Sequence, residues 1–448
     1  MSASTLTHPG EETGTCGCHA EPVPTSRISR RSVLKGAGAL ATVAVAVPGF
    51  GTAAFASNNL SRRGDIIVNV FLRGGMDGLS IVAPLHEGAG ANFLAAARPT
   101  LAVDPATLLP LSADFGLHPA MASLMPAWNA DRLALIPAGG FVQSNRSHFT
   151  VQKHIDLGVD LGAPATMGWL GRHLEVTASP PPDGLRAATL PRAQGSLDGS
   201  TIAVSLNRVD NFQVSGFRGD GSAIQAALAD LHGVDTDAVV DQRAHEALVA
   251  LDLVNNANIT PPANGAAYPA SGRGRNFGNV LAQIAGLIRA DIGLEAVATE
   301  ANFGWDLHSN FGNSVDGRQA SNLAALADTL GAFMVDLGEN ADRVTVVLMT
   351  EFGRTFRENG NAGVDHGRAS TMMVLGGGIN GGVYGEWPGL APEQIDRNAL
   401  RVTVDYRSVL ADILQYRLVT GDLAAVLPGY VDTPEKRLNL ALPLSPVA

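Results

Sequence analysis

The feature that most limits the fold is a set of short apolar runs, each ending at glycine or a polar cluster. The clearest covers residues 66–72 and leads directly into the turn at residues 73–78. Residues 133–137, 344–349 and 372–375 have the same character. Such runs are typical of strands buried on both faces, as in parallel sheets covered by helices.

Helical patterns separate these runs. They cover residues 118–129, 224–231, 241–254, 280–290, 321–337 and 406–418. The alternation of strands and helices predicts an α/β fold, with a doubly wound, mostly parallel sheet flanked by helices. In such a fold, ligands bind beyond the carboxyl ends of the strands.

The beginning of the chain has the three parts of an export signal. A twin-arginine pair at residues 30–31 precedes an apolar run at 37–47 and an Ala-Phe-Ala cleavage signal at 54–56. The apolar run is shorter than the roughly 20 residues that a membrane-spanning helix needs. We therefore predict a twin-arginine signal peptide over residues 1–56 and no transmembrane helix in the mature form. The protein would be periplasmic, bound to the cell envelope or secreted.

Residues 57–448 would form the mature protein, as one α/β domain with an inserted helical subdomain at about 180–274, between loops rich in Pro and Gly. Cys16 and Cys18 precede the predicted cleavage site, and the mature chain has no other cysteine. Disulfides, a thiol nucleophile and thiolate-bound metals are therefore excluded from the exported form. Any metal must be bound by histidine and carboxylate side chains.

The charge and the glycine pattern exclude further classes of function. The formal net charge is −11, which argues against a nucleic-acid partner. No Gly-rich nucleotide-binding motif is present, and no haem attachment motif supports an exported redox protein.

Acidic and imidazole side chains occur where the predicted strands end. Because parallel strands share one carboxyl edge, these side chains could converge there. Each also has a structural interpretation, such as a turn residue that caps its own backbone. Carboxylates and imidazoles bind divalent metals, and we predict Zn, Mn, Mg or Ca. The candidate metal ligands are Asp77, Asp306, His308, Glu351, Asp365 and His366.

Ser147 stands between a predicted strand and a predicted helix. A hydroxyl at a helix start can be a metal-activated nucleophile, and Arg146 could stabilise an anionic group beside it. The hydroxyl could also cap the helix. The sequence does not decide whether Ser144, Ser147 or neither reacts.

A series of motifs runs in order across nearly all of the mature chain. They are Phe71–Leu79, Leu117–Pro119, Arg146–Phe149, Trp305–Asn310, Thr350–Thr355, Glu358–Asn361, Asp365–Gly367 and Gly376–Gly378. Together they resemble the bacterial DUF1501 family. That resemblance implies twin-arginine export and a relationship to the alkaline phosphatase and sulfatase superfamily, with a metal-dependent hydrolase ancestry.

The superfamily pattern also suggests roles for individual residues. Those that match it in order are Asp77, Ser147, Asp306, Glu351 and His366. Two positions depart from the pattern, since Asn310 and Phe352 stand where histidines are expected. A single metal, repurposed ligands and loss of activity therefore all stay open.

Two functional hypotheses follow. The first is an exported metal-dependent hydrolase of phosphate or sulfate esters, acting on a small-molecule or glycan ester, with Ser147 as nucleophile and Arg146 offsetting negative charge. The second is a non-catalytic secreted binding module of the same fold that recognises a glycan or another exported protein.

Overall fold

The computed structural model describes residues 65–86, 92–177, 185–191, 195–209, 212, 222–232, 239–257, 259–312 and 315–444. All of them belong to one compact unit. The predicted signal peptide lies outside the described residues. None of the described helices is long and apolar enough to cross a membrane.

A mixed nine-stranded sheet forms the centre of the fold, in the order β11-β5-β10-β9-β1-β8-β6-β7, with β12 beside β5. The strands are β1 (Ile66–Phe71), β5 (Leu133–Gly140), β6 (Ala187–Leu190), β7 (Ala203–Ser205), β8 (Ala296–Glu300), β9 (Val344–Met349), β10 (Ser370–Gly376), β11 (Gly382–Val383) and β12 (Val404–Asp405). Strand β10 is antiparallel to β5 and β9, and the other described pairs are parallel. The predicted α/β fold with a mostly parallel sheet is therefore confirmed.

Alternate residues of the central strand face two different cores. Val68 and Val70 of β1 belong to one apolar cluster, whereas Ile67 and Phe71 belong to another. A strand buried on both faces needs apolar residues at successive positions, which explains the continuous apolar run at residues 66–72.

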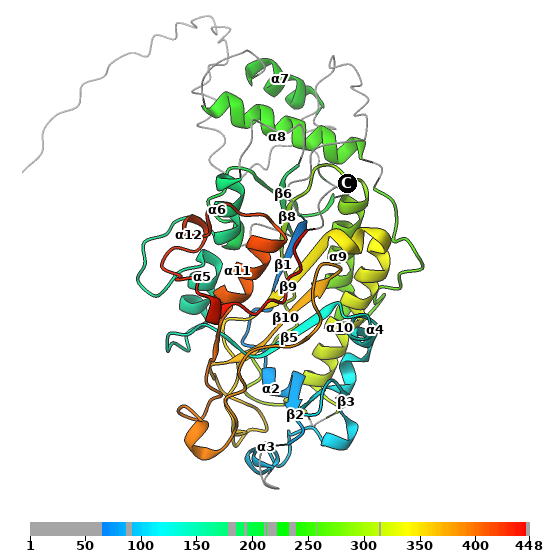
Figure 1. Ribbon diagram of the computed structural model, residues 1–448. Coiled ribbons are helices and arrows are strands. Elements are labelled where there is room, and N and C mark those ends of the chain that lie inside the picture. The colour runs from blue at the N-terminus through cyan, green and yellow to red at the C-terminus, as the bar shows by residue number, and fades with distance from the viewer. Residues whose placement is uncertain are drawn as a thin grey trace, which may run out of the picture. The chain divides into compact units, whose positions relative to one another are not determined.

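Helices complete these two cores. The first core includes α9 (Gly274–Arg289) and α10 (Arg318–Leu337), and the second includes α5 (His148–Leu157), α6 (Trp169–Val176) and α11 (Tyr406–Tyr416). Figure 1 shows the two groups on opposite sides of the sheet. The prediction that helices flank the sheet is therefore confirmed.

Smaller elements surround the sheet. Strands β2 (Val82–Pro84), β3 (Leu109–Pro110) and β4 (Phe115–Leu117) form a separate antiparallel sheet. The short helices are α2 (Gly78–Ile81), α3 (Phe93–Ala97), α4 (Met125–Asn129) and α12 (Leu423–Val426).

The span expected to be an insertion, residues 180–274, contains part of the main sheet. Strands β6 and β7 lie in this span, and β6 pairs in parallel with β8. Helices α7 (Ser222–His232) and α8 (Val239–Asn256) follow β7 and pack against each other. The helical part of the span therefore begins after β7, because backbone hydrogen bonds join the earlier residues to the sheet.

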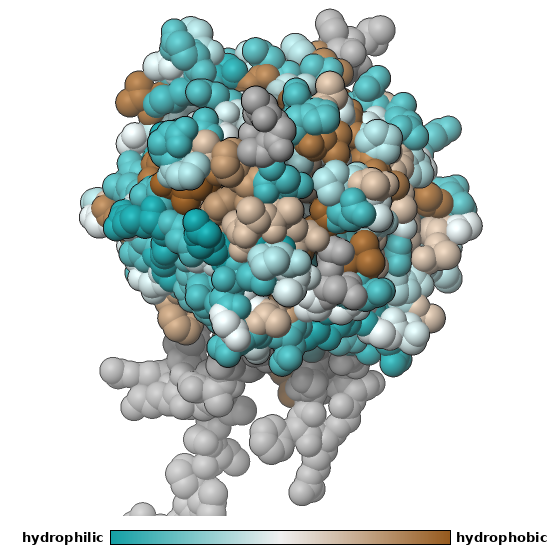
Figure 2. Space-filling model, turned by 90° about the horizontal axis from the view of Figure 1, so that it is seen from below, coloured by the Kyte–Doolittle hydropathy of each residue, from teal (hydrophilic) through white to brown (hydrophobic). Residues whose placement is uncertain are grey.

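The neighbouring strands β8, β1 and β9 are parallel, so their carboxyl ends meet at one edge of the sheet. In Figure 1, α2 follows β1 and lies below it, so this edge faces the lower part of the view. Figure 2 shows the molecule from below, with hydrophobic side chains gathered between hydrophilic ones.

Candidate metal centre

Helix α5 presents a polar face to this edge. Its residues His148, Gln152 and Asp156 recur every four positions and therefore lie on one side of the helix. The side chains of His148 and Gln152 bond to Glu351, which follows β9, and Asp156 pairs with Arg73, which follows β1. These three polar side chains thus hold α5 against the residues that follow β1 and β9.

Four side chains converge in front of α5, and we call them the histidine cluster: His148, Asp306, His308 and His366. The Nε2 atom of His366 lies 3.0 Å from Nε2 of His148 and 3.0 Å from Nε2 of His308. Oδ1 of Asp306 is 3.0, 3.2 and 3.5 Å from Nε2 of His308, His366 and His148. Ligand atoms at 2.0–2.1 Å from a tetrahedral zinc are separated by roughly 3.3 Å. The ligand atoms of His148, Asp306 and His366 lie close enough to one another to hold a single ion, and His308 lies beside them.

The outer nitrogen of each imidazole faces an acceptor. The pairs are His148 with Glu351 at 2.5 Å, His308 with Asp365 at 2.8 Å, and His366 with the backbone carbonyl of Arg146 at 2.9 Å. Because carboxylates and carbonyls only accept, this network assigns the proton to each Nδ1. Hydrogen bonds of this kind usually orient metal-binding histidines.

That assignment has an electrostatic consequence at the centre of the cluster. An imidazole whose single proton is on Nδ1 has a lone pair at Nε2. These lone pairs face one another and the carboxylate of Asp306 at about 3 Å. The donor set therefore fits a cation, which would convert this repulsion into coordination.

Arg354 holds Asp306 in place. Its buried guanidinium donates to Oδ1 of Asp306 at 2.7 Å and also to the carbonyls of Gly74, Gly75 and Trp305. Burial raises the pKa of Asp306, but the hydrogen bond and charge of Arg354 outweigh it, so the pKa is lowered. Asp306 is therefore a carboxylate at neutral pH.

Glu351 is fully buried and accepts hydrogen bonds at both oxygens. Its donors include the Gly74 amide at 2.9 Å, Gln152 at 2.7 Å and Thr350 at 2.9 Å. Burial raises the pKa of Glu351, but the hydrogen bonds, led by that of His148, lower it overall. The same hydrogen bond raises the pKa of His148. Glu351 therefore remains ionised and orients His148.

The structure brings most of the predicted ligands together in two layers. Asp306, His308 and His366 lie in the histidine cluster, whereas Glu351 and Asp365 bind its outer nitrogens. The side chains of Asp306 and His308 are each 45% exposed, so the cluster is open to a ligand from solvent.

Asp77 lies elsewhere, in a buried ion pair. Its two oxygens accept from Nη1 and Nη2 of Arg98 at 2.6 and 2.9 Å, and Oδ2 also binds Ser80. Its side chain is only 2% exposed. Because Arg98 occupies both oxygens, we leave Asp77 out of the ligand set that the sequence analysis expected.

Ser147 is the N-cap residue of α5, yet its side chain makes no capping hydrogen bond. Its hydroxyl is exposed and accepts from Thr150 at 3.3 Å. The capping role considered from the sequence is therefore not observed. The neighbouring Arg146 supports His366 through its carbonyl, while its guanidinium donates to the carbonyl of Arg397 at 2.9 Å.

His148 is the cluster residue that the sequence analysis did not assign. A single histidine at a helix start carries little information, because it occurs often without any ligand role. The polar repeat of His148, Gln152 and Asp156 on a helix that also buries Val151 and Ile155 was the available signal.

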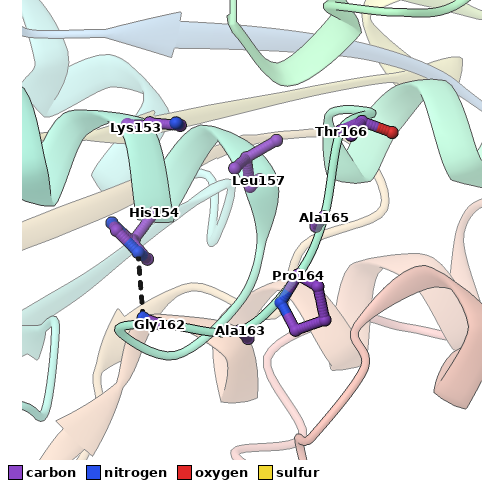
Figure 3. Close-up of a pocket in the computed structure, with 8 residues that line it drawn as sticks. All are labelled: Lys153, His154, Leu157, Gly162, Ala163, Pro164, Ala165 and Thr166. Carbon is purple, nitrogen blue, oxygen red and sulfur yellow. Dashed lines mark hydrogen bonds between the residues drawn. The ribbon is translucent and has the colours of Figure 1, made fainter.

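A separate hollow of about 420 Å³ lies beside α5 (Figure 3). It is lined by Lys153, His154, Leu157, Gly162, Ala163, Pro164, Ala165 and Thr166. The Gly162 amide approaches Nε2 of His154 at 3.4 Å, as the dashed line in Figure 3 shows. No member of the histidine cluster lines this hollow, so it is distinct from the candidate metal centre.

Several solved structures are similar to this chain at low identity. A sulfatase from Pseudoalteromonas sp. is 8% identical, with 79% of this chain and 67% of that chain covered and a TM-score of 0.32. The alkaline phosphatase from the Antarctic bacterium TAB5 is 11% identical, with 71% of this chain and 94% of that chain covered and a TM-score of 0.29. The phosphonate monoester hydrolase of Agrobacterium radiobacter is 9% identical, with 83% of this chain and 78% of that chain covered and a TM-score of 0.33.

No curated protein matches the sequence. The model of the family described as "Protein of unknown function (DUF1501)" matches residues 65–415. This chain therefore belongs to the DUF1501 family.

Proposed function

We propose that the protein is an exported metal-dependent hydrolase of phosphate or sulfate esters, which acts on a small-molecule or glycan ester. The observation that carries the proposal is the convergence of three Nε2 atoms on the carboxylate of Asp306. A cluster that is held from outside and open to solvent on one side is the arrangement that a catalytic metal requires.

The histidine cluster would bind one divalent ion. Its imidazoles favour Zn over Mn, Mg or Ca, which prefer oxygen ligands. Glu351 and Asp365 would orient the histidines rather than bind the ion. A bound ion would supply a Lewis acid that polarises an ester oxygen.

Ser147 is the proposed nucleophile. It directly precedes His148, and its hydroxyl is exposed and free of the helix cap. In the first step its oxygen would bond to phosphorus or sulfur while the ester bond breaks and the alcohol leaves with a proton. Water would then hydrolyse the seryl ester and regenerate the hydroxyl. Arg146 would offset negative charge on the substrate.

The twin-arginine motif supports export of a protein that is already folded. Metal would then bind in the cytosol, before transport. This part of the proposal rests on the sequence of residues 1–56, which lie outside the described residues.

The test combines metal analysis with turnover. Protein folded in the cytosol should contain about one equivalent of Zn, and His366→Ala should lose it. His154→Ala is the matched control, because His154 lies on α5 but outside the cluster. The protein should hydrolyse aryl phosphates or aryl sulfates. Protein that folds without metal and without turnover would contradict the proposal, whereas bound metal without turnover would favour the binding module.

A further inference from the structure

Arginine side chains gather beside the histidine cluster. Arg146 lies two residues before His148, and Arg368 lies two residues after His366. Two residues span at most about 7 Å of backbone, so both arginines begin close to the candidate metal ligands. Arg397 completes this set, since its carbonyl accepts from Nη2 of Arg146 at 2.9 Å. We call Arg146, Arg368 and Arg397 the arginine group.

The arginine group has more positive charge than its partners neutralise. Asp396 pairs with Arg368, and its other oxygen lies 3.4 Å from Nε of Arg397. No described carboxylate lies within ion-pair distance of Arg146. Arg368 and Arg397 therefore share one carboxylate while Arg146 has none, so the group keeps two positive charges.

The loop that carries Arg397 is held in an uncommon conformation. Arg397 and Asn398 have φ values of 47° and 62°, in the left-handed region that non-glycine residues rarely adopt. Asn398 fixes the loop through hydrogen bonds with the amides of Phe356 at 2.8 Å and Arg357 at 3.1 Å. The Arg397 side chain is 72% exposed, yet its Nη2 is directed to the Ser144 hydroxyl at 2.9 Å.

We propose that the arginine group is a second anion-binding subsite, which binds a sulfate or phosphate group of the substrate other than the ester at the metal centre, with Arg146 shared between the two anions. Guanidinium groups bind tetrahedral oxyanions through paired hydrogen bonds. The substrate would therefore be polyanionic, such as a glycan sulfated at more than one position or a molecule with several phosphates. The inference rests on the proposed function in one respect, that the ester at the metal centre is the first anion.

The test measures binding of defined probes to the purified protein, first with metal removed by a chelator and then with zinc restored. One probe is a heparin-derived tetrasaccharide, and the other is tripolyphosphate. Titration calorimetry of the chelated protein should show binding of at least one probe. Arg397→Gln and Arg146→Gln should each weaken it by about tenfold or more, because each removes a charge-assisted hydrogen bond.

Arg132→Gln is the matched control. Arg132 is also exposed and ion-paired, but it precedes β5 at the opposite edge of the sheet. The Arg132→Gln variant should bind the probes with the same affinity as the unmodified protein. An unsulfated tetrasaccharide should not bind to either.

Each outcome bears on the subsite. Binding of the tetrasaccharide alone assigns sulfated glycans, and binding of tripolyphosphate alone assigns phosphates. Binding of neither probe overturns the proposal, and so does an equal loss of affinity in Arg397→Gln and Arg132→Gln. Probe binding is measured after metal removal, so it does not depend on whether the metal centre binds an ion. Loss of probe binding therefore reports on the subsite alone, and the metal analysis reports on the metal centre.

Discussion

His148 and His366 stand 218 positions apart in the chain, yet their Nε2 atoms lie 3.0 Å from each other. His148 belongs to the first turn of α5, and His366 belongs to the loop between β9 and β10. Each ring is oriented by a different acceptor on its outer side. The candidate metal centre therefore depends on the outer contacts as much as on the facing nitrogens.

Replacing an outer contact should weaken metal binding without removing a ligand. Glu351→Gln keeps the size of the side chain but loses the charge that orients His148. We expect zinc affinity to fall by about 10- to 100-fold, as measured by competition with a chromophoric chelator. The matched control is Glu300→Gln, whose side chain pairs with Arg73 instead. Equal zinc affinity in Glu351→Gln and the unmodified protein would contradict the proposed role.

Loss of the Ser147 hydroxyl should separate chemistry from metal binding. Ser147→Ala should retain the metal, because the hydroxyl contacts Thr150 rather than the histidine cluster. Its turnover of aryl esters should fall by at least about 100-fold, since a nucleophile is lost. Ser144→Ala is the control and should retain most of the turnover. Full activity in Ser147→Ala would exclude this serine as the nucleophile.

The buried pair of Asp77 and Arg98 should matter for stability and not for metal content. Burial raises the pKa of Asp77, but Arg98 outweighs it and the pKa is lowered, so the pair is ionic. Asp77→Asn would leave Arg98 buried without a counter-charge and should cost about 3–5 kcal/mol of unfolding free energy. Urea denaturation measures this cost.

The exposed pair of Arg132 and Asp342 provides the comparison for that experiment. Asp342→Asn should cost no more than about 1 kcal/mol, because water screens a surface pair. Metal loss on Asp77→Asn in protein that remains folded would show that Asp77 belongs to the metal centre after all.

His173 should make the protein sensitive to acid. Burial, with the charge of Arg186, lowers the pKa of His173 to about 4, below its value of about 6.5 in the unfolded chain. The folded state therefore favours the neutral ring. The stabilising contribution of neutral His173 is complete above about pH 6.5. It is lost as the pH falls to about 4, because the unfolded chain takes up the proton first. The loss approaches about 3 kcal/mol.

His173→Asn tests this sign. Asparagine retains a polar partner for the Thr420 hydroxyl, which lies 2.9 Å from Nδ1 of His173. Urea denaturation between pH 4 and pH 7 should show a flatter pH dependence in the variant than in the unmodified protein. Identical pH profiles would mean that His173 is charged in the folded state or does not contribute.

Much of the fold could be predicted from local patterns. The strands at β1, β5, β9 and β10 were readable because residues buried on both faces must be apolar at successive positions. Strand β8 was not predicted, since its short Ala-rich sequence becomes a strand only through parallel pairing with β1 and β6. Pairing between distant segments leaves no local periodicity to detect.

The sequence by itself determined the chemistry available to the candidate site. With no cysteine after Cys18, any metal must bind histidine and carboxylate, and those residues follow the strands. Only the tertiary structure decided their roles. It pairs Asp77 with Arg98, places Glu351 behind His148, and leaves Asp306 at the centre. These assignments depend on burial and on which charge lies closest, and both are set by residues far apart in the chain.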